Sequence, residues 1–293
     1  MKKLVRIMGL CALVALAFSS CRKNENTPKT FMASAAKIEA DSKTHLNGGF
    51  FTGFRLVWDE GDEIRVFNHA GESRGFIASN VSGGNATFHV YEPDVEFMAD
   101  FETPNSYTAF YPNVSVTDTQ IKMSIPAEQT YTYGVNFLSN TFPMHGTNVL
   151  NPETQVTEFA FSADAGALVL QLMKKNEASA DPIYLDSLVV VSSTEFLSGD
   201  VVYTRGTNAY DTFIGSGQSV SLVLDQPIEI TKGSTTFFTF VLPAGTLSRV
   251  FTARGYYQGP SNKLFEISTA GDYAANTIGK GKITAMPTID LPQ

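Results

Sequence analysis

Residues 163–174 read Ala-Asp-Ala-Gly-Ala-Leu-Val-Leu-Gln-Leu-Met-Lys, and this stretch decides whether the chain contains helices or strands alone. Its Ala, Leu, Met and Lys residues have a high helix propensity. Gly166 and the tight Leu-Val-Leu-Gln-Leu run favour a strand, because glycine destabilises the interior of a helix. We therefore predict a strand here. No other segment after residue 29 shows a convincing helical period.

The rest of the chain has the rhythm of an all-β protein. Short runs rich in Val, Ile, Thr, Phe and Tyr are separated by Gly, Asn, Asp and Pro about every 8–12 residues, which is typical of a β-sandwich. Turn sequences such as Gly83-Gly84-Asn85 supply the positive φ angles that tight connections require. The predicted strands are residues 30–38, 54–58, 63–68, 86–91, 107–111, 120–125, 157–161, 167–173, 183–191, 219–224, 235–242, 250–257, 263–267 and 282–291.

The least regular stretch is residues 131–155, which contains Pro143 and Pro152. We place a domain boundary there. The prediction is an N-terminal β-sandwich domain over residues 30–152 and a C-terminal β-sandwich domain over residues 153–293. Each half is long enough to close a hydrophobic core of its own.

The composition indicates a folded protein that does not bind nucleic acid. Of 293 residues, 43% are hydrophobic and only 17% are charged, which excludes a disordered chain. The 29 acidic and 21 basic side chains give a net charge of −8. Phosphate contact requires a basic face, so this balance argues against a nucleic-acid partner.

The N-terminus has the pattern of a secretory signal. Lys2, Lys3 and Arg6 precede an apolar run over residues 7–18. Such a run is too short to cross a bilayer core, which requires about 20 residues. We predict that residues 1–20 are a removed signal peptide.

The end of this signal indicates a lipid anchor. Phe18-Ser19-Ser20-Cys21 resembles a bacterial lipobox, in which the cysteine is acylated and becomes the first residue of the mature chain. Several acyl chains give stable membrane anchoring, whereas one does not. We predict lipidation (palmitate) at Cys21 and a polar tether over residues 21–29. The alternative is that Cys21 merely lies near a conventional cleavage site.

Motifs that carry catalysis or bind metal are not evident in the sequence. The four histidines have no metal-type spacing, and there is no Gly-x-Ser-x-Gly motif, phosphate-binding loop or thiol nucleophile in the mature chain. The histidines, which we interpret as surface or turn residues, are His45, His69, His89 and His145. We therefore expect no enzyme activity, no catalytic residue, no metal and no cofactor.

Two local features have both a binding and a structural interpretation. Asp59-Glu60-Gly61-Asp62 could offer carboxylates to Ca²⁺, but it lacks the regular spacing of a calcium loop. We interpret it as a solvated hairpin turn. Trp58 could stack on a sugar, but a single Trp at the end of an apolar strand is more typical of a core.

The stretch from Trp58 to Phe67, Trp-Asp-Glu-Gly-Asp-Glu-Ile-Arg-Val-Phe, resembles the fimbrillin family of Bacteroidetes lipoproteins. That family commonly has a Trp, a Gly-Asp pair and then an alternating strand. Three further stretches fit the resemblance in order and spacing: Tyr107-Thr-Ala-Phe-Tyr-Pro112, Phe240-Val-Leu-Pro-Ala-Gly245 and a terminal strand over residues 283–291. With the lipobox, the similarity covers essentially the whole chain.

The resemblance implies two transthyretin-like β-sandwich domains and a role as subunit or accessory protein of type V pili. In that family a trypsin-like protease cuts after an Arg or Lys behind the first strand, and a strand from the next subunit fills the groove. Where many members have Thr-Arg, this chain has Lys43-Thr44-His45, so Lys43 and Arg55 are the nearest candidate processing sites. An uncut member would suit an anchor or accessory role better than a stalk role.

The last strand is the candidate donor. Its apolar residues alternate with a period of two, which suits one face buried in a groove and one in water. They are Ile283, Ala285, Pro287, Ile289 and Leu291, and only Met286 breaks the alternation. The alternative is an ordinary last strand that closes its own domain.

We therefore predict a non-catalytic, lipid-anchored protein of the outer membrane, exposed on the cell surface or in a fimbrium. Its expected partners are other fimbrial subunits, the membrane through its anchor, and ligands on host or bacterial surfaces. The alternative is a glycan-binding surface lipoprotein of a nutrient-uptake system. A glycan binder should expose clustered aromatic side chains on one face, whereas a pilin should have a detachable first strand. Whether the subunit is anchor, stalk or tip stays open.

We expect Cys21→Ser to abolish membrane anchoring, because no other cysteine stands behind the apolar signal. The variant should partition into the aqueous phase in detergent phase separation, whereas the wild type partitions into the detergent phase. A variant that stays with the detergent phase would show that the lipid is not attached at Cys21.

Overall fold

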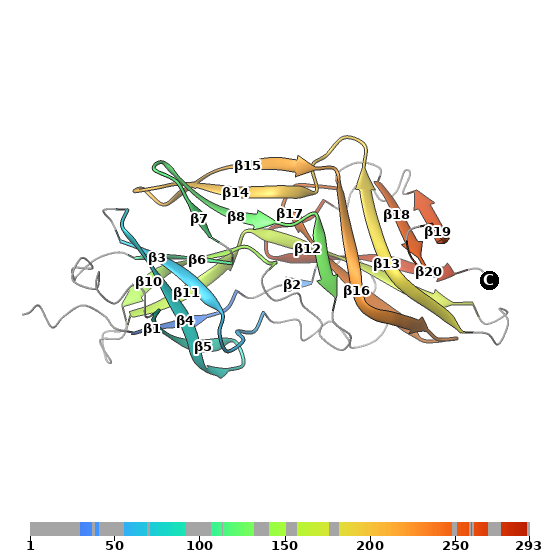
Figure 1. Cartoon of the computed structure of the whole chain (residues 1–293), viewed down its shortest axis with the longest axis horizontal. Coiled ribbons are helices and arrows are strands. Elements are labelled where there is room, and N and C mark those ends of the chain that lie inside the picture. The colour runs from blue at the N-terminus through green and yellow to red at the C-terminus, as the bar shows by residue number, and fades with distance from the viewer. Residues whose placement is uncertain are drawn as a thin grey trace, which may run out of the picture.

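A computed structural model describes residues 30–36, 39–40, 56–68, 71–91, 107–112, 114–131, 141–150, 157–175, 182–247, 251–257, 259, 261–268 and 277–291. Within these ranges every regular element is a strand, and no helix is present (Figure 1). The predicted all-β class is confirmed. The stretch that decided it forms a strand, β12, over Ala165–Lys174.

Seven strands close on themselves into a barrel. Around the barrel these strands are β1 (Thr30–Ser34), β11 (Thr157–Ala163), β10 (Met144–Leu150), β6 (Thr108–Tyr111), β3 (Glu63–Phe67), β4 (Ser73–Ser82) and β5 (Asn85–Val90). Its interior is filled by aromatic rings, and Trp58 packs edge-on against Phe88, Tyr111 and Phe161, each at 5.1 Å between centroids. Trp58 is therefore a core residue, as its position after an apolar run predicts.

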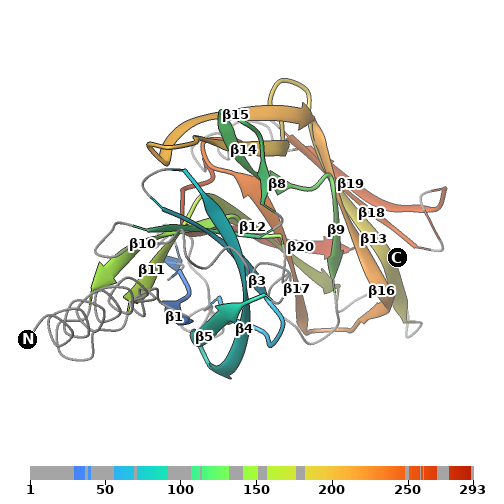
Figure 2. The ribbon, with the colours of Figure 1, turned by 60° about the vertical axis from the view of Figure 1, so that its left-hand side comes forward.

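The other strands form three open sheets. The first sheet contains, in order, β17 (Thr235–Pro243), β12, β20 (Lys282–Leu291) and β2 (Glu39–Ala40). The second contains β19 (Lys263–Ser268), β18 (Phe251–Tyr256), β13 (Ile183–Ser192), β16 (Ser219–Ile230) and β9 (Glu128–Tyr131). The third contains β15 (Ala209–Gly217), β14 (Ser198–Thr204), β8 (Gln120–Ile125) and β7 (Ser115–Val116). Figures 1 and 2 show the barrel at one end of the molecule and β13, β16, β18 and β19 at the other. These layers fit a sandwich-like arrangement.

Strand β12 lies in the centre of its sheet and is buried on both faces. A strand covered on both faces shows a continuous apolar run instead of alternation. This explains why residues 167–172 carry no polar residue except Gln171, and why their pattern alone does not distinguish a strand from a buried helix.

Strands on the two sides of residue 152 pair with one another. Strand β8 pairs with β14 and β9 pairs with β16, while β11 pairs with β1 and β10. The predicted domains over residues 30–152 and 153–293 therefore share sheets. That the chain folds as two domains with these bounds stays a prediction.

Several strands differ from the sequence prediction. Residues 56–58, predicted as part of a strand over 54–58, are not in a strand. The sequence prediction lacks the strands β2, β4, β7, β9, β10, β14 and β15. Strand β15 is an edge strand with most of its side chains exposed, and β10 lies in the stretch that Pro and Asn made irregular. An exposed edge strand such as β15 lacks the apolar run or clean alternation on which the prediction depends. Strand β10 is paired on both sides within the barrel, but its own sequence contains Gly and Asn, which also interrupt that pattern.

Gly166 marks the closest approach of two segments. A Cβ atom at this position would overlap the carbonyl oxygen of Gly279 and lie 2.6 Å from Ile278 Cγ2. We expect Gly166→Ala to lower the free energy of unfolding by about 1–3 kcal/mol, because overpacking displaces backbone. Gly84→Ala is the matched control, since the nearest atom to its Cβ would be 3.8 Å away. Urea titration of both variants measures the difference, and equal stabilities would contradict the packing at Gly166.

Candidate functional site

Strand β1 closes the barrel between two longer neighbours. It runs parallel to β11, with Ala33 opposite Phe159, and antiparallel to β5, with Phe31 opposite Phe88. Only five residues, Thr30–Ser34, make up this strand. Removing it would leave the facing backbone groups of β5 and β11 without partners, and such edges accept another strand.

One large side chain holds β1 in place. Phe31 is fully buried, and its ring lies 4.9 Å from Phe76, 5.0 Å from Phe159 and 5.5 Å from Tyr107. Burial of such a ring contributes about 1.5–3 kcal/mol. Ala33 is the other buried residue on this face, whereas Met32 points outward and is 40% exposed. Strand β1 therefore presents a large residue and then a small one to the barrel interior.

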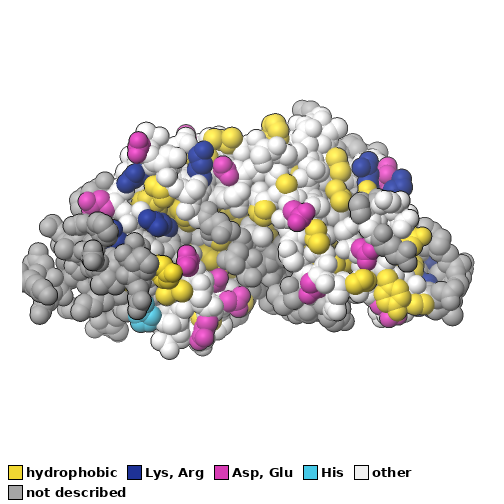
Figure 3. All heavy atoms as spheres, in the orientation of Figure 1, with side chains coloured by type: hydrophobic (Ala, Val, Ile, Leu, Met, Phe, Trp, Pro, Cys, Tyr) yellow, Lys and Arg dark blue, Asp and Glu magenta, His cyan; other side chains and the backbone are white. Residues whose placement is uncertain are grey.

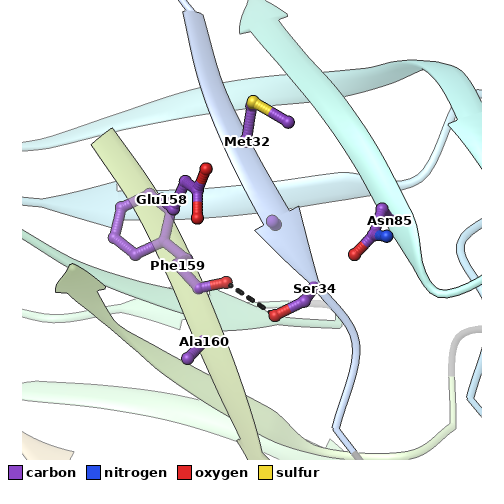
Figure 4. Close-up of a pocket in the computed structure, with 7 residues that line it drawn as sticks. Met32, Ser34, Asn85, Glu158, Phe159 and Ala160 are labelled. Carbon is purple, nitrogen blue, oxygen red and sulfur yellow. Dashed lines mark hydrogen bonds between the residues drawn. The ribbon is translucent and has the colours of Figure 1, made fainter. Parts of the chain in front are cut away.

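A hollow of about 300 Å³ lies over the junction between β1 and β11 (Figure 4). The residues that line it are Met32, Ala33, Ser34, Asn85, Glu158, Phe159 and Ala160. The Ser34 hydroxyl donates to the carbonyl oxygen of Phe159 across this junction at 3.4 Å, which is long for a hydrogen bond between oxygen atoms. The outer face of β1 is therefore loosely packed.

Strand β20, the predicted donor, lies parallel to β12 in its own molecule. The pairing shifts between Val169 and Gln171, where β20 contains one extra residue. The Gln171 side-chain amide donates to the carbonyl oxygen of Met286 at 2.6 Å and satisfies the backbone at this β-bulge. Strand β2 covers the other edge of β20 only at Lys282 and Ile283.

The bulge divides the alternating residues of β20 between two faces. Ile283 and Ala285 pair with Ala167 and Val169 on one face, whereas Ile289 pairs with Leu172 on the other. An extra residue in a strand reverses the direction of every following side chain, which is why the simple alternation does not hold in the folded chain. Leu291 lies on the same face as Ile289, and Pro287 is exposed at the bulge.

A buried carboxylate joins β11 to β12. Asp164, whose side chain has no exposed surface, accepts hydrogen bonds from Tyr203 OH at 2.7 Å and from His145 Nδ1 at 2.8 Å. Lys280 Nζ lies 2.5 Å from the same carboxylate and 5.5 Å from the centre of the exposed Tyr210 ring. Burial raises the pKa of Tyr203, and the charge of Asp164 raises it further, so the phenol keeps its proton and donates it.

His145 and Asp164 were not predicted as functional residues. The partners of Asp164 come from β10, β14 and the turn before β20, at sequence distances such as 19 and 39 residues. Nothing in the local sequence indicates that they meet.

The acidic turn at residues 59–62 is held by hydrogen bonds, and its last residue, Asp62, is buried. Asp59 N donates to Asp62 Oδ2 at 2.8 Å, and Tyr111 OH donates to Asp62 Oδ1 at 3.1 Å. Burial is the main influence on Asp62 and raises the pKa of its carboxyl group. The expectation that the whole turn is solvated was therefore wrong at Asp62. In the part of the chain that the structure describes, no three His, Cys, Asp or Glu side chains are grouped to hold a metal ion.

Other predicted site residues lie outside the described residues. They are Cys21, Lys43 and Arg55, together with His45 and His69. His89, on β5, is exposed as expected. Across the ranges described above, no helix is long and apolar enough to cross a membrane.

Among the described residues, the exposed aromatic side chains are Tyr91, Tyr184, Phe196, Tyr210 and Tyr257. Tyr184 and Tyr257 lie on or beside the paired strands β13 and β18, and the others lie elsewhere in the fold. The face in Figure 3 carries its apolar side chains in separate small groups between polar ones. Among the described residues of this face, the view shows no single large cluster of apolar side chains.

Comparison with known proteins finds similar solved structures but no similar sequence. No protein-family model and no curated protein sequence matches the chain. A candidate cell adhesion protein from Bacteroides ovatus ATCC 8483 is 12% identical, with 89% of this chain and 92% of that chain covered and a TM-score of 0.50. A candidate cell adhesion protein from Bacteroides uniformis ATCC 8492 has the same identity and coverage and a TM-score of 0.49.

A fimbrial protein from Bacteroides ovatus ATCC 8483 is 14% identical to this chain, with a TM-score of 0.45. The match covers 90% of this chain and 49% of that one. Structural neighbours of the chain are thus Bacteroides proteins named for cell adhesion and fimbriae. The likeness to the first Bacteroides ovatus protein shows a shared fold.

We expect Tyr203→Phe to lower the free energy of unfolding by about 1–3 kcal/mol, because the buried Asp164 carboxylate loses a donor. Tyr210→Phe is the control, since its ring is 55% exposed and lies on the neighbouring strand. Its effect should stay within about 0.5 kcal/mol. Chemical denaturation of both variants measures this, and a Tyr203→Phe protein as stable as Tyr210→Phe would show that the phenol contributes nothing to the carboxylate.

Proposed function

We propose that the chain is a non-catalytic, lipid-anchored component of type V fimbriae that acts in cell adhesion and assembles by β-strand exchange. The observation that carries this proposal is the position of β1, a five-residue strand that closes a barrel through one large buried side chain. The names of the structural neighbours support an adhesion or fimbrial role at the cell surface. The lipobox ending at Cys21 supports anchoring in the outer membrane.

The groove left by β1 would select its occupant by side-chain size. The occupant has to supply a large apolar residue in place of Phe31 and a small one in place of Ala33, two residues later. Ile283 and Ala285 of β20 offer this order. To place Ile283 and Ala285 at the positions of Phe31 and Ala33, a neighbour's β20 would have to run parallel to β11, as β1 does.

Strand β20 is not fully satisfied in its own sheet. The Thr284 hydroxyl is buried and has no hydrogen-bond partner within the described part of the chain. An unpaired buried hydroxyl costs about 1–3 kcal/mol. Moving β20 to a site where this hydroxyl reaches water or an acceptor would recover part of that free energy.

Processing would act on both strands at once. Lys43 and Arg55 follow β1 and β2 in the sequence, so a cut at either one would separate both strands from the rest of the chain. The cut would open the groove between β5 and β11 and uncover the edge of β20 at Lys282 and Ile283. A chain that stays uncut would offer β20 but no groove, which fits an anchor or accessory subunit.

The strand-exchange part of the proposal predicts that weakening β1 makes the groove available. We expect Phe31→Ala to bind a labelled peptide of residues 281–291 at least tenfold more tightly than the wild type, because β1 loses its main anchor. Met32→Ala is the matched control on the same strand, since Met32 points outward. Fluorescence anisotropy measures the binding, and an Ile283→Asp peptide should not bind.

Equal binding to Phe31→Ala and Met32→Ala would mean that the groove of β1 is not the acceptor. The fimbrial assignment has its own test in N-terminal sequencing of isolated surface filaments. We expect this chain to be present there, beginning at Thr44 or Leu56 if it is cut, or blocked at Cys21 if it is not. Its absence from filaments that contain other subunits would contradict the assignment.

A further inference from the structure

The segment from β11 to β12 pairs with both strands of the proposed exchange. Strand β11 ends at Ala163 and β12 begins at Ala165, so that Asp164 alone separates them. Strand β1 pairs in parallel with β11, and β20 pairs in parallel with β12. Asp164 therefore lies at the joint between β11, which borders the proposed acceptor groove, and β12, which pairs with the proposed donor strand.

The backbone before β20 forms a turn that is fixed at both ends. Ile278 N donates to Thr246 O at 2.9 Å, and Gly281 N donates to Ala165 O at 2.8 Å. Lys280 lies in this turn between Gly279 and Gly281, and Gly281 has a φ angle of 65°. The two flanking glycines allow the backbone to rotate once these hydrogen bonds break, so we take this turn as the hinge of β20.

One ion pair crosses from this hinge to the joint. Lys280 Nζ contacts Asp164 Oδ1 at 2.5 Å, where the carboxylate is fully buried and the lysine side chain is 48% exposed. The other two donors to Asp164 are Tyr203 of β14 and His145 of the barrel strand β10. Lys280 is the lysine partner of the carboxylate, so its loss would leave a buried charge with weaker compensation.

We propose that the Lys280–Asp164 ion pair is a latch that holds β20 in its own sheet and that its opening permits β20 to leave. The role of the latch in assembly rests on the proposed donor function of β20. The latch also connects β20 to the barrel, because the same carboxylate binds His145 of β10, and β10 pairs with β11 beside β1. Movement of β11 after the loss of β1 would therefore act directly on Asp164.

Hydrogen exchange of the monomeric protein tests the latch without any filament. Lys280→Met keeps the length of the side chain and removes its charge, and we expect the amides of β20 to exchange about three- to tenfold faster. Amides of β13 and β16, which are remote from the latch, should not change. Lys175→Met is the matched control, because Lys175 is an exposed lysine immediately after β12.

A double-mutant cycle assigns the effect to the pair. In an Asp164→Asn background, Lys280→Met should add no further acceleration, because the charge that it balanced is gone. If Asp164→Asn does not fold, the comparison of Lys280→Met with Lys175→Met still decides the question. Equal exchange of β20 in these two variants, or an equal acceleration in β13 and β16, would overturn the latch.

Hydrogen exchange and peptide binding together distinguish a failure of the latch from a failure of the proposed strand exchange. Faster exchange of β20 in Lys280→Met, combined with no peptide binding to the Phe31→Ala groove, would keep the latch and refute strand exchange. Peptide binding together with unchanged β20 exchange would keep strand exchange and refute the latch. If both are right, Lys280→Met should enter filaments faster than Lys175→Met.

Discussion

The arrangement of the molecule depends on the backbone hydrogen bonds of residues 157–174, which serve two sheets in succession. As β11 this segment pairs with β1 and β10 in the barrel, and as β12 it pairs with β17 and β20 in the neighbouring sheet. A β-strand has two edges, so each half of the segment is fully used by its two partners. The change of sheet occurs at Asp164, the single residue between β11 and β12.

A buried charge at such a joint requires compensation, and the fold supplies it from three directions. Tyr203, His145 and Lys280 come from three different elements and converge on Asp164, and Tyr203 OH also lies 2.9 Å from His145 Nδ1. Removing a charge from water is costly unless it is paired and hydrogen-bonded. The contacts of Asp164 therefore connect β10, β14 and the turn before β20 at one point.

The two strands that could be exchanged are held by different means. Strand β1 is short and depends on Phe31, whereas β20 is long, has a bulge that Gln171 satisfies, and begins at a hinge tied to Asp164. Apart from its backbone pairing with β5 and β11, β1 is held mainly by Phe31, so a strand with an apolar residue of similar size could take its place. Strand β20 has its long pairing with β12 and, in addition, the ion pair at its hinge. This difference agrees with the proposed exchange, in which β1 is lost and β20 is offered.

The sequence by itself determined the all-β class, most of the longer strands and the core position of Trp58, because these depend on local patterns of apolar residues and turn formers. It also indicated the signal segment and the lipobox at Cys21, which depend on a short contiguous pattern. Only the tertiary structure decided that one sheet closes as a barrel, that a bulge divides Ile283 and Ala285 from Ile289 and Leu291, and that Asp164 collects three distant donors. Those features arise from which edges pair and in which register, and pairing is set by contacts between residues far apart in the chain, which no local pattern of side chains records.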